Sequence, residues 1–351
     1  MLIQVYPTTM RLAACVLALV GGCRKVGTAN APPAARVSET CRLMGVPWTI
    51  TAFAANPEAG REAVAAAFAE VRRLEGILSD YDPQSELAQL SAAAPTQSPV
   101  RVGDDLWRVL RAAEGWREMS GGAFDPTVGP LTTLWRQARR SGVMPRADKL
   151  AAARQAVGAA ALTLEVEQQA VSLRVPGMRL DLGGIGMGYA VDRALAVLAE
   201  RGVTRAMVDA SGDIAVSGPP PGVAAWRIDV AALSDREGGE ERRVVELVNA
   251  AVTTSGDAFQ AVEIDCVRYS HIVDPRTGLG VPGPAAVTVI APDCTTADAV
   301  ATAASVLGPE AGLALVEAVP GAAARFVAGG PSGRQEFRSS RWSSQSSQPR
   351  R

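Results

Sequence analysis

The sequence predicts an α+β fold in which helices pack against antiparallel sheets. Short apolar segments of strand composition follow one another through tight connections, which favours antiparallel pairing. Amphipathic helices lie between them without the regular strand–helix–strand alternation of a parallel sheet. The chain has 351 residues, 48% of them hydrophobic and 20% charged, so it can bury a sizeable core.

The predicted helices are segments in which apolar residues recur every three or four positions. They cover about 58–79 and about 104–119, a third segment that ends at Gly202, and a fourth from about Thr295 to Gly308. The predicted strands alternate apolar and polar residues or are short apolar runs. They cover 47–54, 161–166, 170–175, 205–209, 213–217, 225–230, 243–248, 261–265, 267–273, 285–291 and 323–328.

The first residues have the pattern of a secretory signal. Arg11 precedes a short apolar stretch, and the small residues Gly21 and Gly22 precede Cys23, as in a bacterial lipoprotein signal with Cys23 as the lipid-bearing residue. Secretion with Cys23 incidental is the alternative. We expect a location in the cell envelope, on the periplasmic side of the bacterial inner membrane. The predicted division is a signal peptide at 1–23, a flexible tether at 24–42, a folded domain at 43–330 and a disordered polar tail at 331–351.

Composition argues against several classes of function. The net charge is −1, the pI is about 6.0 and aromatic residues make up 5%, so no nucleic-acid partner is expected. Beyond Cys23 the cysteines are Cys41, Cys266 and Cys294, which are widely spaced. This spacing argues against a thiolate metal site or a dense disulfide framework and leaves a single disulfide open.

The one histidine of the sequence, His271, is the first candidate for proton transfer. It lies in the turn-rich segment from Arg268 to Gly278. Imidazole is the side chain whose unperturbed pKa lies near neutral pH, which suits a general base. A turn histidine that satisfies local hydrogen bonds is the alternative.

A glycine-rich segment from Arg179 to Ala190 leads into the third predicted helix. Glycines there allow backbone amides to approach a phosphate, and a helix N-terminus favours an anion. A dinucleotide-binding Rossmann unit is an alternative, with Asp209 as the ribose-binding acid. The glycine spacing differs from that fingerprint, and no second strand–helix–strand unit follows it. A plain tight turn also stays open.

Asp298 and Thr302 lie four residues apart in the fourth predicted helix, so they share one face. A carboxylate, a hydroxyl and nearby backbone carbonyls are ligands that suit Mg²⁺. An acid that only interacts favourably with the helix dipole is the alternative. Two turn-rich segments, 79–87 with Tyr81 and 121–131, are longer than simple connections require and are either parts of a site or loop structure.

In this order, the motifs resemble the ApbE family of FAD:protein FMN transferases. The resemblance covers about 43–330 and rests on Met44–Gly45, 81–86, 122–129, 181–192, 212–214, 254–257, 270–278 and 298–303. It implies an α+β fold related to the tunnelling fold, in an enzyme that uses FAD and Mg²⁺. Such enzymes attach FMN through a phosphoester to a threonine of an acceptor flavoprotein and release AMP. Members are often envelope lipoproteins, and known acceptors are redox-driven ion pumps and electron-transfer proteins of the envelope.

The resemblance also implies site residues. A flavin would contact Met44, Tyr81, Ala123, Phe124, Asp125, Asp181, Met187 and Ile272. Mg²⁺ would be held by Asp298, Thr302 and the backbone carbonyl of Gly184. His271 would be the base, with Asp257 or Asp274 as carboxylate candidates.

The chain departs from the family pattern at three positions. Met187 stands where most relatives carry lysine, Gln260 where many carry arginine, and Ser211 replaces a glycine. The first two changes remove cations near the expected substrate. They leave open an FAD-binding envelope lipoprotein without turnover. A Mg²⁺-dependent FAD pyrophosphatase, in which the same site uses water, and a nicotinamide dehydrogenase are further alternatives.

Overall fold

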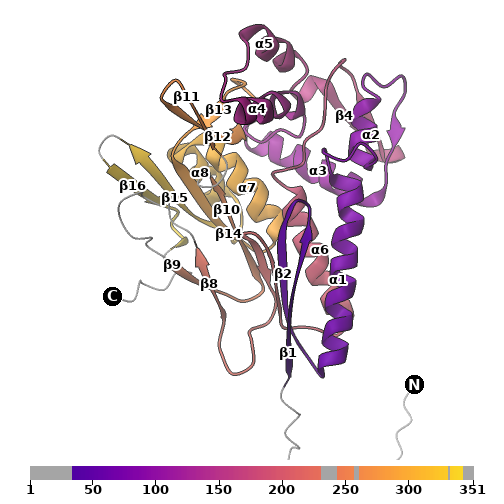
Figure 1. The fold of residues 1–351 in the computed structure, drawn as a ribbon, viewed down its shortest axis with the longest axis vertical. Coiled ribbons are helices and arrows are strands. Elements are labelled where there is room, and N and C mark those ends of the chain that lie inside the picture. The colour runs from indigo at the N-terminus through magenta and orange to yellow at the C-terminus, as the bar shows by residue number, and fades with distance from the viewer. Residues whose placement is uncertain (1–33, 231–242, 257–260, 331–332, 343–351) are drawn as a thin grey trace, which may run out of the picture. The chain divides into compact units, whose positions relative to one another are not determined.

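An eight-stranded sheet, in which every neighbouring pair is antiparallel, forms the centre of the fold (Figure 1). The computed structural model describes residues 34–230, 243–256, 261–330 and 333–342. Along the sheet the strands are β1 (Ala35–Leu43), β2 (Val46–Ala54), β6 (Ala206–Ala210), β7 (Asp213–Val216), β10 (Ala250–Gly256), β14 (Ala285–Ala291), β15 (Ala323–Gly330) and β16 (Gly333–Arg338).

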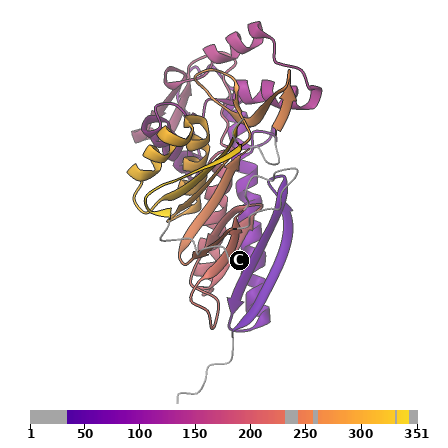
Figure 2. The same ribbon diagram turned by 90° about the vertical axis from the view of Figure 1, so that its left-hand side faces the viewer.

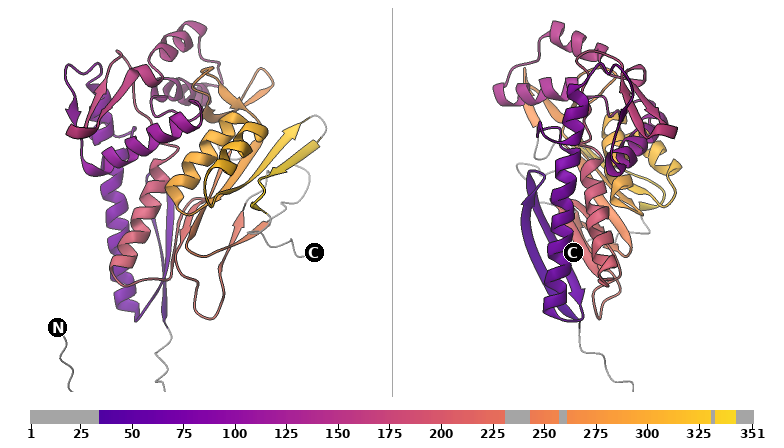
Figure 3. Two further views of the ribbon diagram at one scale, coloured as in Figure 1. Left: turned by 180° about the vertical axis from the view of Figure 1, so that it is seen from behind. Right: turned by 90° about the vertical axis from the view of Figure 1, so that its right-hand side faces the viewer.

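Helices cover one face of this sheet (Figure 3). They are α1 (Pro57–Leu78), α6 (Gly186–Glu200), α7 (Cys294–Leu307) and α8 (Pro309–Ala318), and each contacts the next in this order. Their apolar stripes form the main core with the inward residues of the strands, such as Val287 and Val289 of β14. The glycine-rich loop before α6 is thereby placed beside α7.

The opposite face of the sheet is covered by a two-stranded ribbon. It consists of β8 (Trp226–Val230) and β9 (Arg243–Leu247). Ile290 points to this side, whereas its neighbour Val289 points to the helices, as the alternation of side chains along a strand requires. Trp342 is fully buried in the same cluster.

The smaller elements gather at one end of the sheet (Figure 2). One three-stranded sheet has the order β3-β5-β4 and the other β11-β12-β13. Their bounds and those of the remaining helices are α2 (Glu86–Ala92), β3 (Val100–Arg101), α3 (Asp104–Met119), α4 (Gly129–Ser141), α5 (Ala147–Gln155), η1 (Ala159–Ala161), β4 (Leu162–Glu165), η2 (Val166–Gln168), β5 (Ala170–Leu173), β11 (Ala261–Ile264), β12 (Val267–Val273) and β13 (Gly280–Pro282).

The predicted α+β class is confirmed, and the four predicted helices correspond to α1, α3, α6 and α7. The proposed limits of the folded domain were wrong at both ends. Residues 35–42 of the predicted tether belong to β1, and residues 333–338 of the predicted tail form β16. Both are edge strands of the large sheet, so each has one neighbouring strand and a mostly polar sequence that resembles a linker. The predicted signal peptide lies outside the described residues.

The antiparallel sheet also removes the basis for the Rossmann alternative. A dinucleotide-binding unit requires parallel strands joined through a helix. Here β6, which carries Asp209, pairs antiparallel with both β2 and β7.

Among the residues that the structure describes, no helix is both long enough and apolar enough to cross a bilayer.

Candidate functional site

The glycine-rich loop and the start of α6 pack directly against α7. A Cβ atom added to Gly184 would lie 2.8 Å from Oγ1 of Thr302, and one added to Gly188 would lie 2.9 Å from Cβ of Asp298. The Gly188 N–H group donates a hydrogen bond of 3.1 Å to Oδ2 of Asp298. Only glycine permits this approach. The fold therefore brings Gly184, Asp298 and Thr302 together, while metal binding by them stays a prediction.

The carboxyl group of Asp298 is strongly perturbed by its surroundings. It is 5% exposed, and burial together with the nearby charge of Asp213 raises its pKa well above the ordinary value. Burial also raises the pKa of Asp213, at the start of β7, to about 6, against a hydrogen bond from Thr253. Since desolvation and mutual repulsion both disfavour the ionised forms, a cation between these groups would stabilise them.

The oxygen groups around Asp298 fit a hard cation. Across the described ranges, no group of three or more His, Cys, Asp or Glu side chains is arranged to hold a metal ion. A cation here would therefore need hydroxyl and backbone oxygens as well as a carboxylate. Mg²⁺ accepts such a set, because it is usually held by one or two carboxylates and completes its shell with water or substrate phosphates.

Asp181 links the glycine-rich loop to α4. Its Oδ1 accepts a hydrogen bond of 2.8 Å from the Gly183 N–H group. Its Oδ2 accepts bonds from Oγ1 of Thr132 at 2.7 Å and from Nη2 of Arg136 at 3.0 Å. The carboxylate is therefore held by three donors, and the loop that follows it is fixed at its first residues.

Arg136 also holds an exposed tyrosine in place. Its guanidinium forms an ion pair with Asp80 and lies 4.1 Å from the centre of the Tyr81 ring. Burial and the neighbouring charge of Asp181 raise the pKa of Asp80. Tyr81 is 72% exposed, so its ring is available to a ligand while the cation restrains it. This geometry suits the flavin contact predicted for Tyr81.

The turn-rich segment after α3 forms the wall next to Asp181. The Asp181 N–H group donates to the Pro126 carbonyl oxygen at 2.8 Å. Ala123 and Phe124 are 1% and 4% exposed, so a flavin contact with them would require local movement of this segment. The carboxylate of Asp125 accepts bonds from the N–H and hydroxyl groups of Thr127, and burial raises the pKa of Asp125.

The two predicted methionine contacts lie at the rim of the main core. Met44 occupies the turn between β1 and β2 with a positive φ of 47°, and its N–H group donates to Oε1 of Glu75 at 2.8 Å. Met187 is in the first turn of α6 and is half-buried. Both side chains pack against the main core.

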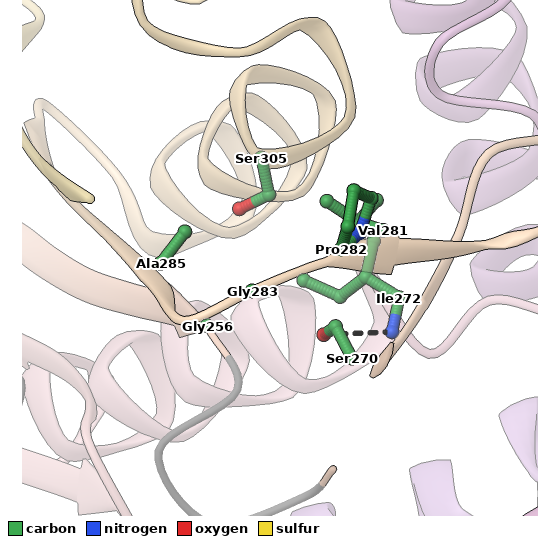
Figure 4. Close-up of a pocket in the computed structure, with 8 residues that line it drawn as sticks. All are labelled: Gly256, Ser270, Ile272, Val281, Pro282, Gly283, Ala285 and Ser305. Atoms are coloured by element: carbon green, nitrogen blue, oxygen red, sulfur yellow. Dashed lines mark hydrogen bonds between the residues drawn. The ribbon is translucent and has the colours of Figure 1, made fainter. Parts of the chain in front are cut away.

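Strand β12 carries His271 and lies against α7. Ser270 and Ile272 line a small pocket together with Ser305, one turn beyond Thr302 on α7 (Figure 4). Figure 4 shows Ser305 entering from the helix and the other two residues from the strand. His271 itself is half-buried. The strand with the predicted base is thus adjacent to the helix with the predicted metal ligands.

The two carboxylate candidates for the base differ in what the structure shows. Asp274 follows β12, and its Oδ1 accepts hydrogen bonds of 2.9 Å from both the N–H group and Nε of Arg276. This local pair holds the turn, and a role for Asp274 in proton transfer stays a prediction. Asp257 lies outside the described residues, as does Gln260.

Comparison with known proteins identifies the family. A sequence model described as the ApbE family matches residues 44–326. The chain belongs to the ApbE family. Among curated relatives, the FAD:protein FMN transferase of Vibrio cholerae is 34% identical over 247 residues, which cover 69% of this chain and 72% of that protein. The enzyme of the same name from Treponema pallidum is 33% identical over 331 residues, 89% of each chain.

Solved structures of ApbE proteins have the same fold. The flavin transferase ApbE from Vibrio cholerae aligns with a TM-score of 0.80 at 29% identity, covering 89% of this chain and all of that one. The apo form of the flavinyl transferase ApbE from Pseudomonas stutzeri gives a TM-score of 0.79 at 31% identity, over 89% and 97% of the two chains. The predicted family and the predicted fold are both confirmed.

In this ApbE chain, helix α4 contributes to the site in a way that was not predicted from the sequence. Thr132 and Arg136 lie four residues apart on this helix, and both reach Asp181. Gly129 and Pro130 belong to the segment predicted as turn-rich, although proline in the first turn of a helix is common. The sequence did contain a signal for this role, because Thr132 and Arg136 are polar residues four positions apart directly after a helix start that contains proline.

Proposed function

We propose that this chain is a Mg²⁺-dependent FAD:protein FMN transferase that attaches FMN to a threonine of an acceptor flavoprotein and releases AMP. The observation that carries the proposal is the meeting of the glycine-rich loop with Asp298 and Thr302, within a chain of the ApbE family. The curated relatives bear the name of this activity.

In the proposed reaction, the acceptor hydroxyl oxygen attacks the phosphorus atom of the FMN half of FAD. The bond from that phosphorus to the bridging oxygen breaks, and AMP leaves with the bonding electron pair. The hydroxyl must lose its proton, because neutral threonine is a weak nucleophile. His271 is the proposed acceptor of this proton, since imidazole is basic near neutral pH, and Asp257 or Asp274 would orient or replace it.

Asp298, Thr302 and the Gly184 carbonyl oxygen are the proposed Mg²⁺ ligands. When bound, Mg²⁺ would neutralise negative charge on the pyrophosphate oxygens. The helix dipole at the N-terminus of α6 would add partial positive charge on the same side. Because Met187 replaces a lysine common in relatives, the N-terminus of α6 and the ion would supply the positive charge in this chain.

The flavin is proposed to stack on Tyr81, which Arg136 restrains from the other side. The remaining proposed flavin contacts follow from the family resemblance. They are Met44, Ala123, Phe124, Asp125, Asp181, Met187 and Ile272.

We also propose that the mature protein is a lipoprotein anchored through Cys23 at the periplasmic side of the inner membrane. The support is the sequence from Arg11 to Cys23. Expression in a bacterial host should give a protein that partitions with membranes, and Cys23→Ser should release it into the periplasmic fraction. Membrane partitioning that persists in Cys23→Ser would contradict the anchor.

The transferase proposal can be tested by incubating the protein with FAD, Mg²⁺ and an acceptor peptide that contains threonine. We expect a covalently fluorescent peptide and an equal amount of AMP, both abolished by a chelator. Thr302→Val should raise the Mg²⁺ concentration needed for half-maximal transfer. Thr296→Val is the matched control, because it makes the same change elsewhere on α7 and should leave that concentration unchanged.

Two results would contradict the transferase assignment. AMP release at a comparable rate without acceptor, and without labelled peptide, would indicate an FAD pyrophosphatase. Tight FAD binding with no AMP release would indicate a binding lipoprotein.

A further inference from the structure

The glycine-rich loop with α6 meets α7 at three successive points. Gly184 faces Thr302, Gly188 faces Asp298 and the Cys294 carbonyl group, and Asp192 meets the first turn of α7. Each point is about four residues from the next on both segments, which is about 6 Å along a helix. The two segments therefore run in opposite directions, and a shift of either would change all three contacts together.

At the third point, Asp192 binds the start of α7 through three hydrogen bonds. Its Oδ1 accepts from the Cys294 N–H group at 2.8 Å. Its Oδ2 accepts from the N–H group of Thr295 at 2.8 Å and from the hydroxyl group of Thr295 at 2.5 Å. N–H groups in the first turn of a helix have no partner within the helix, so this carboxylate satisfies two of them.

A second carboxylate at the same helix start provides a contrast. Asp293 is the N-cap of α7, and its Oδ1 accepts a bond of 2.7 Å from the Thr296 N–H group. Both aspartates interact favourably with the N-terminus of α7. Asp293 precedes α7 directly in the chain, whereas Asp192 belongs to α6. Of these two carboxylates, the one that ties α7 to α6 is therefore Asp192.

We propose that Asp192 is a positioning residue that fixes how α6 and α7 are aligned and thereby holds Gly184 close to Asp298 and Thr302. The first two contacts involve glycines, which offer no side chain to resist sliding. Three charge-assisted hydrogen bonds at the third contact resist both sliding and rotation. The inference rests on the metal site proposed above, for which Asp192 would act through the arrangement of the helices and without touching the ion.

The test compares Asp192→Asn with Asp293→Asn in the full-length protein. Both substitutions remove one negative charge at the start of α7 and keep the side-chain size. Asparagine is about as good an N-cap as aspartate, so Asp293→Asn keeps its role. At position 192 the amide nitrogen of asparagine cannot accept a hydrogen bond, so part of the attachment to α7 is lost.

Direct binding of Mn²⁺, followed by electron paramagnetic resonance, measures the site without turnover. We expect Asp192→Asn to raise the Mn²⁺ Kd about tenfold, as is typical when a group that orients metal ligands is changed. Asp293→Asn should stay within about twofold of wild type, and the FAD Kd without metal should be unchanged in both. If Asp192→Asn does not fold, Thr295→Val removes only the hydroxyl donor and should raise the Mn²⁺ Kd to a smaller extent.

The possible failures are distinguishable. If folded Asp192→Asn binds Mn²⁺ with the wild-type Kd, even with a lower Tm, Asp192 only caps the start of α7 and does not position the proposed metal ligands. Equal weakening in Asp192→Asn and Asp293→Asn would indicate a general effect of charge. If the wild-type protein binds no Mn²⁺ with or without FAD, the proposed metal site fails and this inference fails with it.

Discussion

Replacing Gly188 with alanine would test how closely α6 approaches α7. The new Cβ would lie 2.3 Å from the carbonyl oxygen of Cys294, 2.7 Å from its carbonyl carbon and 2.9 Å from Cβ of Asp298. Two of these atoms are backbone atoms of the first turn of α7, which cannot rotate out of the way. Since non-bonded carbon atoms prefer separations of about 3.5–4.0 Å, the helices would have to separate by about 1 Å.

The expected loss of stability follows from three contributions. Overpacking against backbone should lie near the upper end of the usual range, at about 3 kcal/mol. Weakening of the Gly188–Asp298 hydrogen bond adds about 1 kcal/mol. The better helix propensity of alanine offsets at most about 1 kcal/mol. The free energy of unfolding should therefore fall by about 3 kcal/mol, which lowers the Tm by about 4–5 °C for a protein of this size.

Thermal unfolding followed by circular dichroism and calorimetry measures this change. Gly76→Ala is the matched control, because Gly76 lies in the exposed part of α1 and an added Cβ would have no atom within 4 Å. That substitution should raise stability by up to about 1 kcal/mol. A Tm for Gly188→Ala at or above the wild-type value would refute the close approach of the two helices.

Three further variants test other parts of the structure. Arg136→Leu leaves two partly buried carboxylates without their shared cation, so we expect about 3 kcal/mol lower stability in urea unfolding and weaker FAD binding in a fluorescence titration. Burial by itself would raise the pKa of Glu336, but hydrogen bonds from two arginines lower this pKa to about 2. The ionised Glu336 carboxylate therefore makes its full contribution to the free energy of unfolding above about pH 4.5, and this contribution is lost as the pH falls toward 2. Glu336→Gln should therefore lower stability by about 1–2 kcal/mol at pH 7, after allowance for solvent screening, and the difference from wild type should vanish near pH 2. Trp342→Ala removes a fully buried ring and should lower the free energy of unfolding by about 3–5 kcal/mol, whereas an unchanged urea midpoint would show that this end of the chain is dispensable.

Strong local patterns were sufficient to predict several elements. The predicted helix at 104–119 coincides with α3, because its apolar residues recur at helical spacing throughout. The edge strands β1 and β16 were missed for the opposite reason, since each has few fully buried side chains and a mostly polar sequence. Helix α4 was missed because its first residues, Gly129 and Pro130, resemble a turn when they are considered alone.

Part of the candidate site could be predicted from local sequence, and the rest depends on contacts between residues that are distant in the chain. The spacing of Asp298 and Thr302 on one helix face followed from sequence alone, as did the need for glycine before α6. The order of strands in a sheet decides which of these segments become neighbours, and no single segment encodes that order. The pairing of Arg136 with Asp181, 45 residues away, therefore appears only in the folded chain.

The sequence by itself determined the family, the α+β class and the chemical types of the candidate site residues, because these depend on residue identity and local spacing. The tertiary structure decided that Asp192 reaches α7, 102 residues further along the chain, and that Asp298 is buried beside other carboxylates. The physical reason is that hydrogen bonds and burial depend on distances in space. Those distances are set by the packing of helices on the sheet and not by the separation of residues along the chain.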